Sequence, residues 1–245
     1  EKYPEAQKAF EGVVELARRL YPAGEFPDGH ANLATSMNDL GFMYAERAKY
    51  ADAEPLYKDA LAMRRRLFKG DHPAVAASMN NLAALYSDWG KPDAAEPLYK
   101  DALAMRKRWY KGDHPMVAQS LNNLAGLYHK QGKLADAEPL RKESLEMWKR
   151  LHKGDHPDVA LGLNNLAGLY SSQGKLADAE RLYEDALDMR KRMHKGDHPA
   201  IASGMNNLAQ VYQDRGKLAA AEPLLKDALE MWKRVFEGDH PMVAQ

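Results

Sequence analysis

The sequence contains no cysteine among its 245 residues. This absence excludes a disulfide framework, a thiolate metal site and a cysteine nucleophile. It fits a reducing compartment, and we expect a cytoplasmic protein. No segment approaches the roughly 18 consecutive apolar residues that span a bilayer, so the sequence predicts no membrane partner.

An excess of charge of either sign is also missing. The 35 lysines and arginines balance the 35 aspartates and glutamates, which gives a formal net charge of +0. Proteins that hold nucleic acid or anionic membranes through bulk charge carry a basic excess, so the balance argues against both partners. Apolar residues make up 45% and charged residues 29% of the chain, a balance typical of a folded protein and not of a disordered one.

The chain does contain an internal repeat with a fixed interval. The tetrapeptide Gly-Asp-His-Pro returns every 42 residues, and a degraded copy begins one interval earlier at Asp28. Two further strings, Asn-Asn-Leu-Ala and Ala-Glu-Pro-Leu, keep the same interval. A fixed period of about 20–50 residues is the signature of a repeat architecture. The full copies of the first string are 70–73, 112–115, 154–157, 196–199 and 238–241.

The interval divides the chain into five complete repeats and two partial ones. Residues 1–27 have the apolar spacing of the second half of a preceding repeat, followed by a linker. Residues 238–245 open a further repeat and then stop. Repeat arrays usually carry polar capping repeats at their ends, so we expect this chain to be part of a longer one. The complete repeats are 28–69, 70–111, 112–153, 154–195 and 196–237.

Each repeat is predicted to form two helices joined by a short turn. In the second complete repeat, Pro73 suits the first position of a helix, with Asp71 or His72 as its N-cap. Gly90 predicts the end of this helix, and Gly112 predicts a left-handed stop after the next one. Apolar residues recur at helical spacing in both segments. A pair of this kind buries its apolar face only by stacking on other pairs, so we predict an all-α solenoid of antiparallel helix pairs.

The spacing within a repeat is similar to the tetratricopeptide repeat signature. The 42-residue interval and the three strings resemble the longer subclass found in kinesin light chains. The resemblance covers nearly the whole chain and implies a right-handed superhelical solenoid whose first helices line a concave groove. The first repeat departs from the pattern, with Ala31 in place of proline and Ala48 in place of the turn glycine. The residues that carry the resemblance in the second repeat are Leu82, Ala83, Tyr86, Gly90, Ala95, Tyr99 and Ala102.

Motifs for catalysis are missing. The chain has no Gly-x-Ser-x-Gly, no Gly-x-Gly-x-x-Gly, no Walker loop and no His-Glu-x-x-His. Its carboxylates recur with the repeat, as surface residues of a solenoid do. We therefore predict a protein that is not an enzyme, with no catalytic residue and no cofactor.

Six of the nine histidines follow the repeat. Packed helices lie on the order of 10 Å apart, whereas zinc needs its ligands about 2 Å from one point. One histidine per repeat therefore cannot converge on a metal, so we predict no metal site and expect a local hydrogen bond at each loop. A meeting of His152 with His156 stays open as an exception. The periodic histidines are His30, His72, His114, His156, His198 and His240.

A row of arginines follows the repeat as well. Such a row is open to interpretation as a phosphate-binding stripe. However, Glu146, Asp188 and Glu230 each precede an arginine of the row by four residues, which is a favourable pairing on a helix. We therefore favour ordinary solvated helix ends. The row consists of Arg66, Arg108, Arg150, Arg192 and Arg234.

An asparagine holds the same place in the first helix of every repeat, on the side that the resemblance assigns to the groove. An amide offers both donors and an acceptor, so a row of amides can hold the backbone of an extended peptide. The alternative is that these amides bond to neighbouring repeats, which we expect for the adjacent row that begins at Asn81. The groove residues that we predict are Asn38, Asn80, Asn122, Asn164, Asn206, Gln119, His129, Lys130, Ser171, Gln210 and Gln213.

The predicted function is a non-catalytic protein–protein interaction scaffold that binds an extended peptide or partner segment in its concave groove. Because His129 and Lys130 are the only basic residues of the predicted groove, a mostly neutral or weakly charged peptide fits best. Two alternatives stay open. The chain is a regulatory or sensor region of a larger multidomain enzyme or signalling protein, or its uncapped ends associate end to end into an array.

Overall fold

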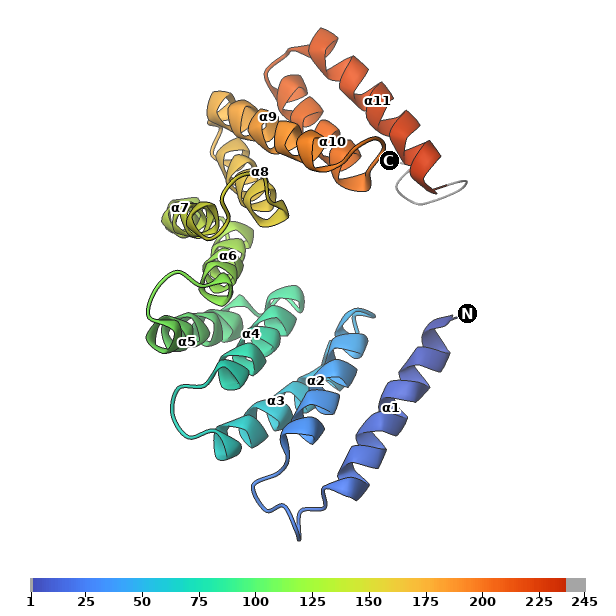
Figure 1. The fold of residues 1–245 in the computed structure, drawn as a ribbon, viewed down its shortest axis with the longest axis vertical. Helices are drawn as coiled ribbons and strands as arrows, with labels where there is room; N and C mark the ends of the chain where they lie inside the picture. Colours follow the sequence, from blue (N-terminus) through green and yellow to red (C-terminus); the bar gives the residue numbers. More distant parts are fainter. Residues whose placement is uncertain (1, 237–245) are drawn as a thin grey trace. The chain divides into compact units, whose positions relative to one another are not determined.

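The computed structural model describes the backbone of residues 2–236 and the side chains of residues 5–236. Within residues 2–236 the chain forms eleven α-helices and no strand (Figure 1), which confirms the all-α prediction. The helices belong to two compact units, Glu1–Gly112 with α1–α5 and Asp113–Gln245 with α6–α11. The helices are α1 (Lys2–Leu20), α2 (Ala31–Ala45), α3 (Tyr50–Leu67), α4 (Pro73–Asp88), α5 (Pro92–Tyr110), α6 (Pro115–Lys130), α7 (Leu134–Leu151), α8 (Pro157–Ser172), α9 (Leu176–Met193), α10 (Pro199–Asp214) and α11 (Leu218–Phe236).

Each 42-residue interval holds one pair of helices packed against each other, from α2 with α3 to α10 with α11. Small residues allow this close packing. Ala83 of α4 and both Ala95 and Ala102 of α5 have no exposed surface. In the second unit one apolar cluster runs through all six helices, so each pair is held by its neighbours as expected for a repeat array.

A histidine caps the start of each first helix. The Nδ1 atom of His72 accepts the backbone N–H of Ala74 at 3.1 Å, and Pro73 is the first residue of α4. His72 is therefore the N-cap, and the choice between Asp71 and His72 is decided. The same capping bond is present at His30, His114, His156 and His198. This confirms the expected local hydrogen bond, while His240 lies outside the described residues.

The capping histidines also stack on a ring that follows the preceding helix. The ring centroids of Phe68 and His72 are 3.8 Å apart, with 2° between the ring planes. The stacked residue is a tyrosine, a phenylalanine or, at two junctions, a histidine, whereas the capping residue is a histidine each time. The other pairs of this kind are Tyr21 with His30, His152 with His156, and His194 with His198.

Two turns depart from the regular pattern. α5 extends to Tyr110, and the left-handed position falls on Lys111, with φ 48° and ψ 47°. The prediction that Gly112 supplies this stop was wrong, because the longer helix moves the left-handed residue one place earlier. In the first repeat Ala48 takes the turn position that Gly90 holds in the second, with φ 54° against 72°.

Candidate functional site

Two of the predicted groove asparagines of the second unit, Asn122 and Asn164, bond to the next repeat. Nδ2 of Asn165 donates to Oδ1 of Asn122 at 3.1 Å, and Nδ2 of Asn207 donates to Oδ1 of Asn164 at 2.8 Å. We call these four residues the amide ladder. Each of its bonds joins a first helix to the next one, as we expected for the adjacent row. The side-chain oxygens of Asn122 and Asn164 therefore have a structural role.

The side-chain nitrogens of the same two residues have no such role. Arg141 donates from Nη1 to Oδ1 of Asn122, which fixes the orientation of this amide because an arginine has no acceptor. Within residues 5–236, Nδ2 of Asn122 and Nδ2 of Asn164 form no hydrogen bond, and neither is sealed from solvent. The ladder thus leaves N–H groups free to donate.

An open cleft of roughly 470 Å³ lies between α6 and α8. It brings together two of the predicted groove residues, Gln119 and Asn122, with two exposed apolar side chains, Met116 and Leu161. A cleft with apolar walls and a few convergent polar groups is the usual form of a binding site. The other lining residues are Pro115, Asn123, Trp148, Asp158, Gly162 and Asn165.

The remaining predicted groove residues lie apart from this cleft. A ring nitrogen of His129 is 2.8 Å from Oγ of Ser172, and burial followed by the charge of Arg141 lowers the pKa of His129. Gln210 donates to Asp214 at 2.9 Å. Lys130 and Gln213 are exposed, while Ser171 and Asn206 are half-buried.

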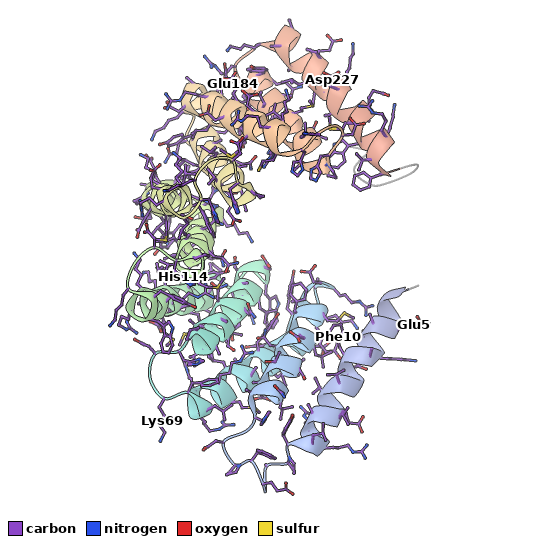
Figure 2. All side chains as sticks on the ribbon, viewed as in Figure 1. Glu5, Phe10, Lys69, His114, Glu184 and Asp227 are labelled. Carbon is purple, nitrogen blue, oxygen red and sulfur yellow. The ribbon has the colours of Figure 1, made fainter. Side chains whose placement is uncertain are left out.

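The two predicted groove asparagines of the first unit are Asn38 and Asn80. Asn80 is only 8% exposed. Oδ1 of Asn38 is buried and has no hydrogen-bond partner. In the same unit, Phe10 (labelled in Figure 2), Phe42, Met43, Glu46 and Arg47 line a pocket, in which Phe42 is 59% exposed.

The sequence analysis missed Arg141. It occupies the place that Tyr57, Tyr99 and Tyr183 hold in other repeats, and only 8% of it is exposed. Nε has no partner, and within the described residues no carboxylate pairs with the guanidinium; burial lowers its pKa to about 10. A Cβ atom added to Gly126 would lie 3.7 Å from Nη2. The break in the tyrosine period was the available signal.

The arginine row forms ion pairs that the sequence analysis did not predict. Nε and Nη2 of Arg150 donate to both carboxylate oxygens of Asp113, at 2.6 and 2.8 Å. Glu146 instead pairs with Lys149 at 2.9 Å. The proposed pairing four residues apart was therefore wrong, because the arginine extends back to the loop that opens its own repeat. The same two-bond pairs join Arg108 to Asp71, Arg192 to Asp155 and Arg234 to Asp197, whereas Arg66 contacts only the backbone of Asp28.

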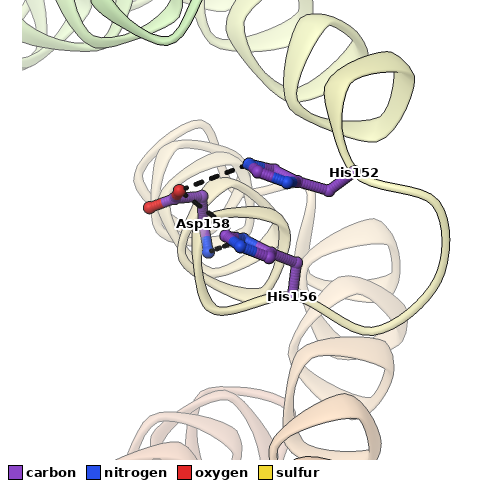
Figure 3. A group of neighbouring side chains, drawn as sticks. All are labelled: His152, His156 and Asp158. Atoms are coloured by element: carbon purple, nitrogen blue, oxygen red, sulfur yellow. Dashed lines mark hydrogen bonds and ion pairs between the residues drawn. The ribbon is translucent and has the colours of Figure 1, made fainter.

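His152 and His156 do meet, at the loop between α7 and α8 (Figure 3). Asp158 lies against both rings, so three metal-ligating side chains come together. Within the part of the chain that the structure describes, this is the one group of its kind.

The repeats match known families along most of the chain. The model named Tetratricopeptide repeat matches residues 32–108 and 116–192, and related models of the same description match 82–149 and 201–241. The chain belongs to the tetratricopeptide repeat family. Repeats of this family point to a protein-interaction scaffold, and the fold is typically non-catalytic. No curated protein matches the chain.

Solved tetratricopeptide repeat structures resemble most of the chain. BtubC (BKLC) from P. vanneervenii is 28% identical, with a TM-score of 0.81, over 98% of this chain and 94% of that one. The nearly identical repeats of a kinesin light chain candidate from Podosopora anserina are 22% identical, with a TM-score of 0.74, over 85% and 99%. The second likeness shows the fold alone. The kinesin-light-chain-type resemblance and the solenoid fold are confirmed.

None of the helices within residues 2–236 combines the length and apolarity that crossing a bilayer requires.

Proposed function

We propose that this tetratricopeptide array is a non-catalytic scaffold that binds an extended peptide along the first helices of its repeats. The observation that carries the proposal is that the oxygen and the nitrogen of the same side-chain amide differ in their bonding within the amide ladder. The oxygens of Asn122 and Asn164 bond to the next repeat, whereas their N–H groups have no partner in the described chain. A row of donors on a rigid helical surface is suited to the backbone carbonyls of an extended segment.

The cleft between α6 and α8 provides the apolar part of such a site. Met116 and Leu161 are 36% and 49% exposed, and Gln119 and Asn122 line the same cleft. Burying a ligand side chain against these two residues supplies binding energy, and the amides fix the course of its backbone. We therefore propose that the bound segment places an apolar side chain in this cleft.

Arg141 favours a ligand with one carboxylate. Its guanidinium is buried beneath Gly126 without a carboxylate partner in the described chain, so its charge is poorly screened. A carboxylate bound above Gly126 would meet this charge and the N–H₂ group of Asn122. A single acidic group agrees with the expectation of a weakly charged peptide.

A peptide display selection on the purified chain tests the proposal. Asn164→Ala removes both the ladder bond and the outward N–H₂ group, whereas Asn207→Ala removes the ladder bond alone. We expect an enriched motif whose binding weakens at least fivefold with Asn164→Ala, because one hydrogen bond contributes about 1 kcal/mol, and little with Asn207→Ala. Equal effects of the two variants would make the amides purely structural and would remove the main support for the groove.

End-to-end self-association has one specific observation in its favour. Leu218, Leu225 and Leu229 of α11 are 64%, 37% and 38% exposed. A second copy stacked on α11 would cover them. Analytical ultracentrifugation of the chain and of Leu225→Lys tests this alternative, because a strict monomer at high concentration would exclude end-to-end association.

A further inference from the structure

The loop between α7 and α8 places three side chains with metal-ligating atoms around one point (Figure 3). Oδ2 of Asp158 is 3.6 Å from Nε2 of His152 and 3.5 Å from Nδ1 of His156. The three donor atoms all lie within 4.8 Å of one another. Ligands of one tetrahedral zinc ion, each about 2.0–2.1 Å from the metal, are about 3.3 Å apart. Two of the three spacings are therefore close to those of a metal site.

We propose that His152, His156 and Asp158 bind a divalent transition-metal ion of the zinc type. Two imidazole nitrogens and one carboxylate oxygen suit zinc and its neighbours, whereas magnesium and calcium prefer oxygen ligands throughout. Three protein ligands leave a fourth position for water or for a group from a partner. All three residues are partly exposed, but Nε2 of His152 is itself buried, so an ion reaches the site from solvent when the rings rearrange.

A second observation supports the site independently of the cluster. Nε2 of His152 is buried and has no hydrogen-bond partner. It faces the Asp158 carboxylate at 3.6 Å, which is too long for a hydrogen bond. A buried polar atom without a partner is costly. A cation between the two groups would satisfy the imidazole lone pair and the carboxylate at once.

Binding requires a small rearrangement of the two rings. They are stacked at 3.4 Å with 4° between their planes, so their lone pairs run nearly parallel and do not meet at one point. The rings must tilt apart, and Nδ1 of His156 must release the backbone N–H of Asp158 that it caps at 3.2 Å. The site is therefore only partly preorganised, and we expect moderate affinity.

The chain carries its own control at the next junction. His194 and His198 stack at 3.5 Å in the same way, but Ala200 stands where Asp158 stands in the proposed site. At another junction Phe68 replaces the first histidine and Ala74 replaces the aspartate. His152 and Asp158 can thus each be replaced by a residue that this fold already accepts at the equivalent place, whereas the capping His156 has no such replacement.

Calorimetric titration of the untagged full chain with zinc chloride tests the proposal. We expect one zinc per chain, no competition from magnesium, and at least a tenfold loss of affinity in both Asp158→Ala and His152→Phe. Ala200→Asp, which adds the missing carboxylate beside His194 and His198, should bind a second zinc. Trp148 stacks on His152 with centroids 5.5 Å apart, so its fluorescence should change on binding, and Trp148→Phe should remove that change.

Several results would overturn the site. These are wild-type affinity in Asp158→Ala or His152→Phe, no measurable binding by the wild type, and a single bound zinc in Ala200→Asp. Unchanged circular dichroism and melting of the metal-free variants would show that lost binding is not caused by unfolding.

Discussion

Arg192 reaches back across its own repeat to hold Asp155, with Nε 2.7 Å from Oδ2 and Nη2 2.9 Å from Oδ1. The arginine ends α9 and the aspartate lies in the loop before α8, so the pair ties the end of the repeat to its beginning. The planar fork of arginine is suited to this two-bond geometry, and lysine is not.

Arg192→Lys is expected to lower the melting temperature slightly, because it keeps the charge but loses the fork. The pair is exposed, and a single exposed ion pair contributes little. Changing Arg108, Arg150, Arg192 and Arg234 to lysine together should therefore lower the melting temperature clearly more. Thermal melting at low and high salt measures this effect. A quadruple variant that melts like the wild type at low salt would show that these pairs do not stabilise the fold.

Glu138 is expected to make the fold sensitive to acid. Hydrogen bonds from Lys142, Lys175 and Gln173 hold its pKa at about 2, below the usual 4.5 of a glutamate. Since the folded-state pKa is the lower one, the stabilisation is fully present above about pH 4.5 and is lost as the pH falls towards 2. Urea unfolding from pH 7 to 2.5 should show a shallower acid loss in Glu138→Gln than in the wild type, with Glu222→Gln as an exposed control.

His198 is expected to cause a loss of stability at mildly acidic pH. Burial, followed by the charge of His194, lowers its pKa below 6.5. The unfolded state therefore binds the proton first, so stability is full above pH 6.5 and declines as the pH falls below it. A protonated ring also cannot accept the N–H of Ala200. His198→Asn should keep the cap and flatten the pH profile, whereas His198→Ala should cost about 1 kcal/mol in urea unfolding at pH 7.5.

Arg141→Tyr is expected to stabilise the second unit while weakening peptide binding. Tyrosine is the residue at the equivalent positions 57, 99 and 183. Because the folded-state pKa of Arg141 is lowered to about 10, its burial costs stability at every pH below that value, and the cost is relieved only at higher pH. Replacing a buried charge by a packed side chain gains about 1–3 kcal/mol. Urea unfolding measures the gain, and Tyr183→Arg should show the opposite sign.

Ala48→Gly is expected to stabilise the first unit by about 1 kcal/mol, since a side chain with positive φ costs roughly that much. The φ of Ala48 is 54°, and glycines hold the equivalent turns of the later repeats, as Gly90 does at 72°. The matched control is Gly90→Ala, which should destabilise by a similar amount in urea unfolding. A destabilised Ala48→Gly would mean that the methyl group has a packing role.

The sequence predicts the helices well because each repeat restates the same signals. Proline at the first position, glycine in the turn and apolar residues at helical spacing recur at one interval, so an error at one repeat is corrected by the others. The exceptions are local. The shift from Gly112 to Lys111 depends on where α5 ends, and helix ends are the part that local patterns define least.

The site is only partly predictable, for a physical reason. The row of Asn122 and Asn164 follows from the repeat, but which amide atom bonds to the next helix depends on packing between repeats. The pairing of Arg150 with Asp113 spans 37 residues, and the sequence offers Glu146 as a competing partner four residues away. Arg141 is visible in the sequence as a break in the tyrosine period. Only the structure shows that its Nε has no hydrogen-bond partner.

The Arg192–Asp155 pair and its counterparts lie wholly inside single repeats, whereas the amide ladder uses identical residue types at successive junctions. A duplication or deletion of 42 residues would therefore join equivalent positions of two repeats, wherever in the array it begins. Genes for such a chain can lengthen or shorten by whole repeats without creating a junction that differs from the existing ones. Arrays of different length thus become accessible through recombination alone.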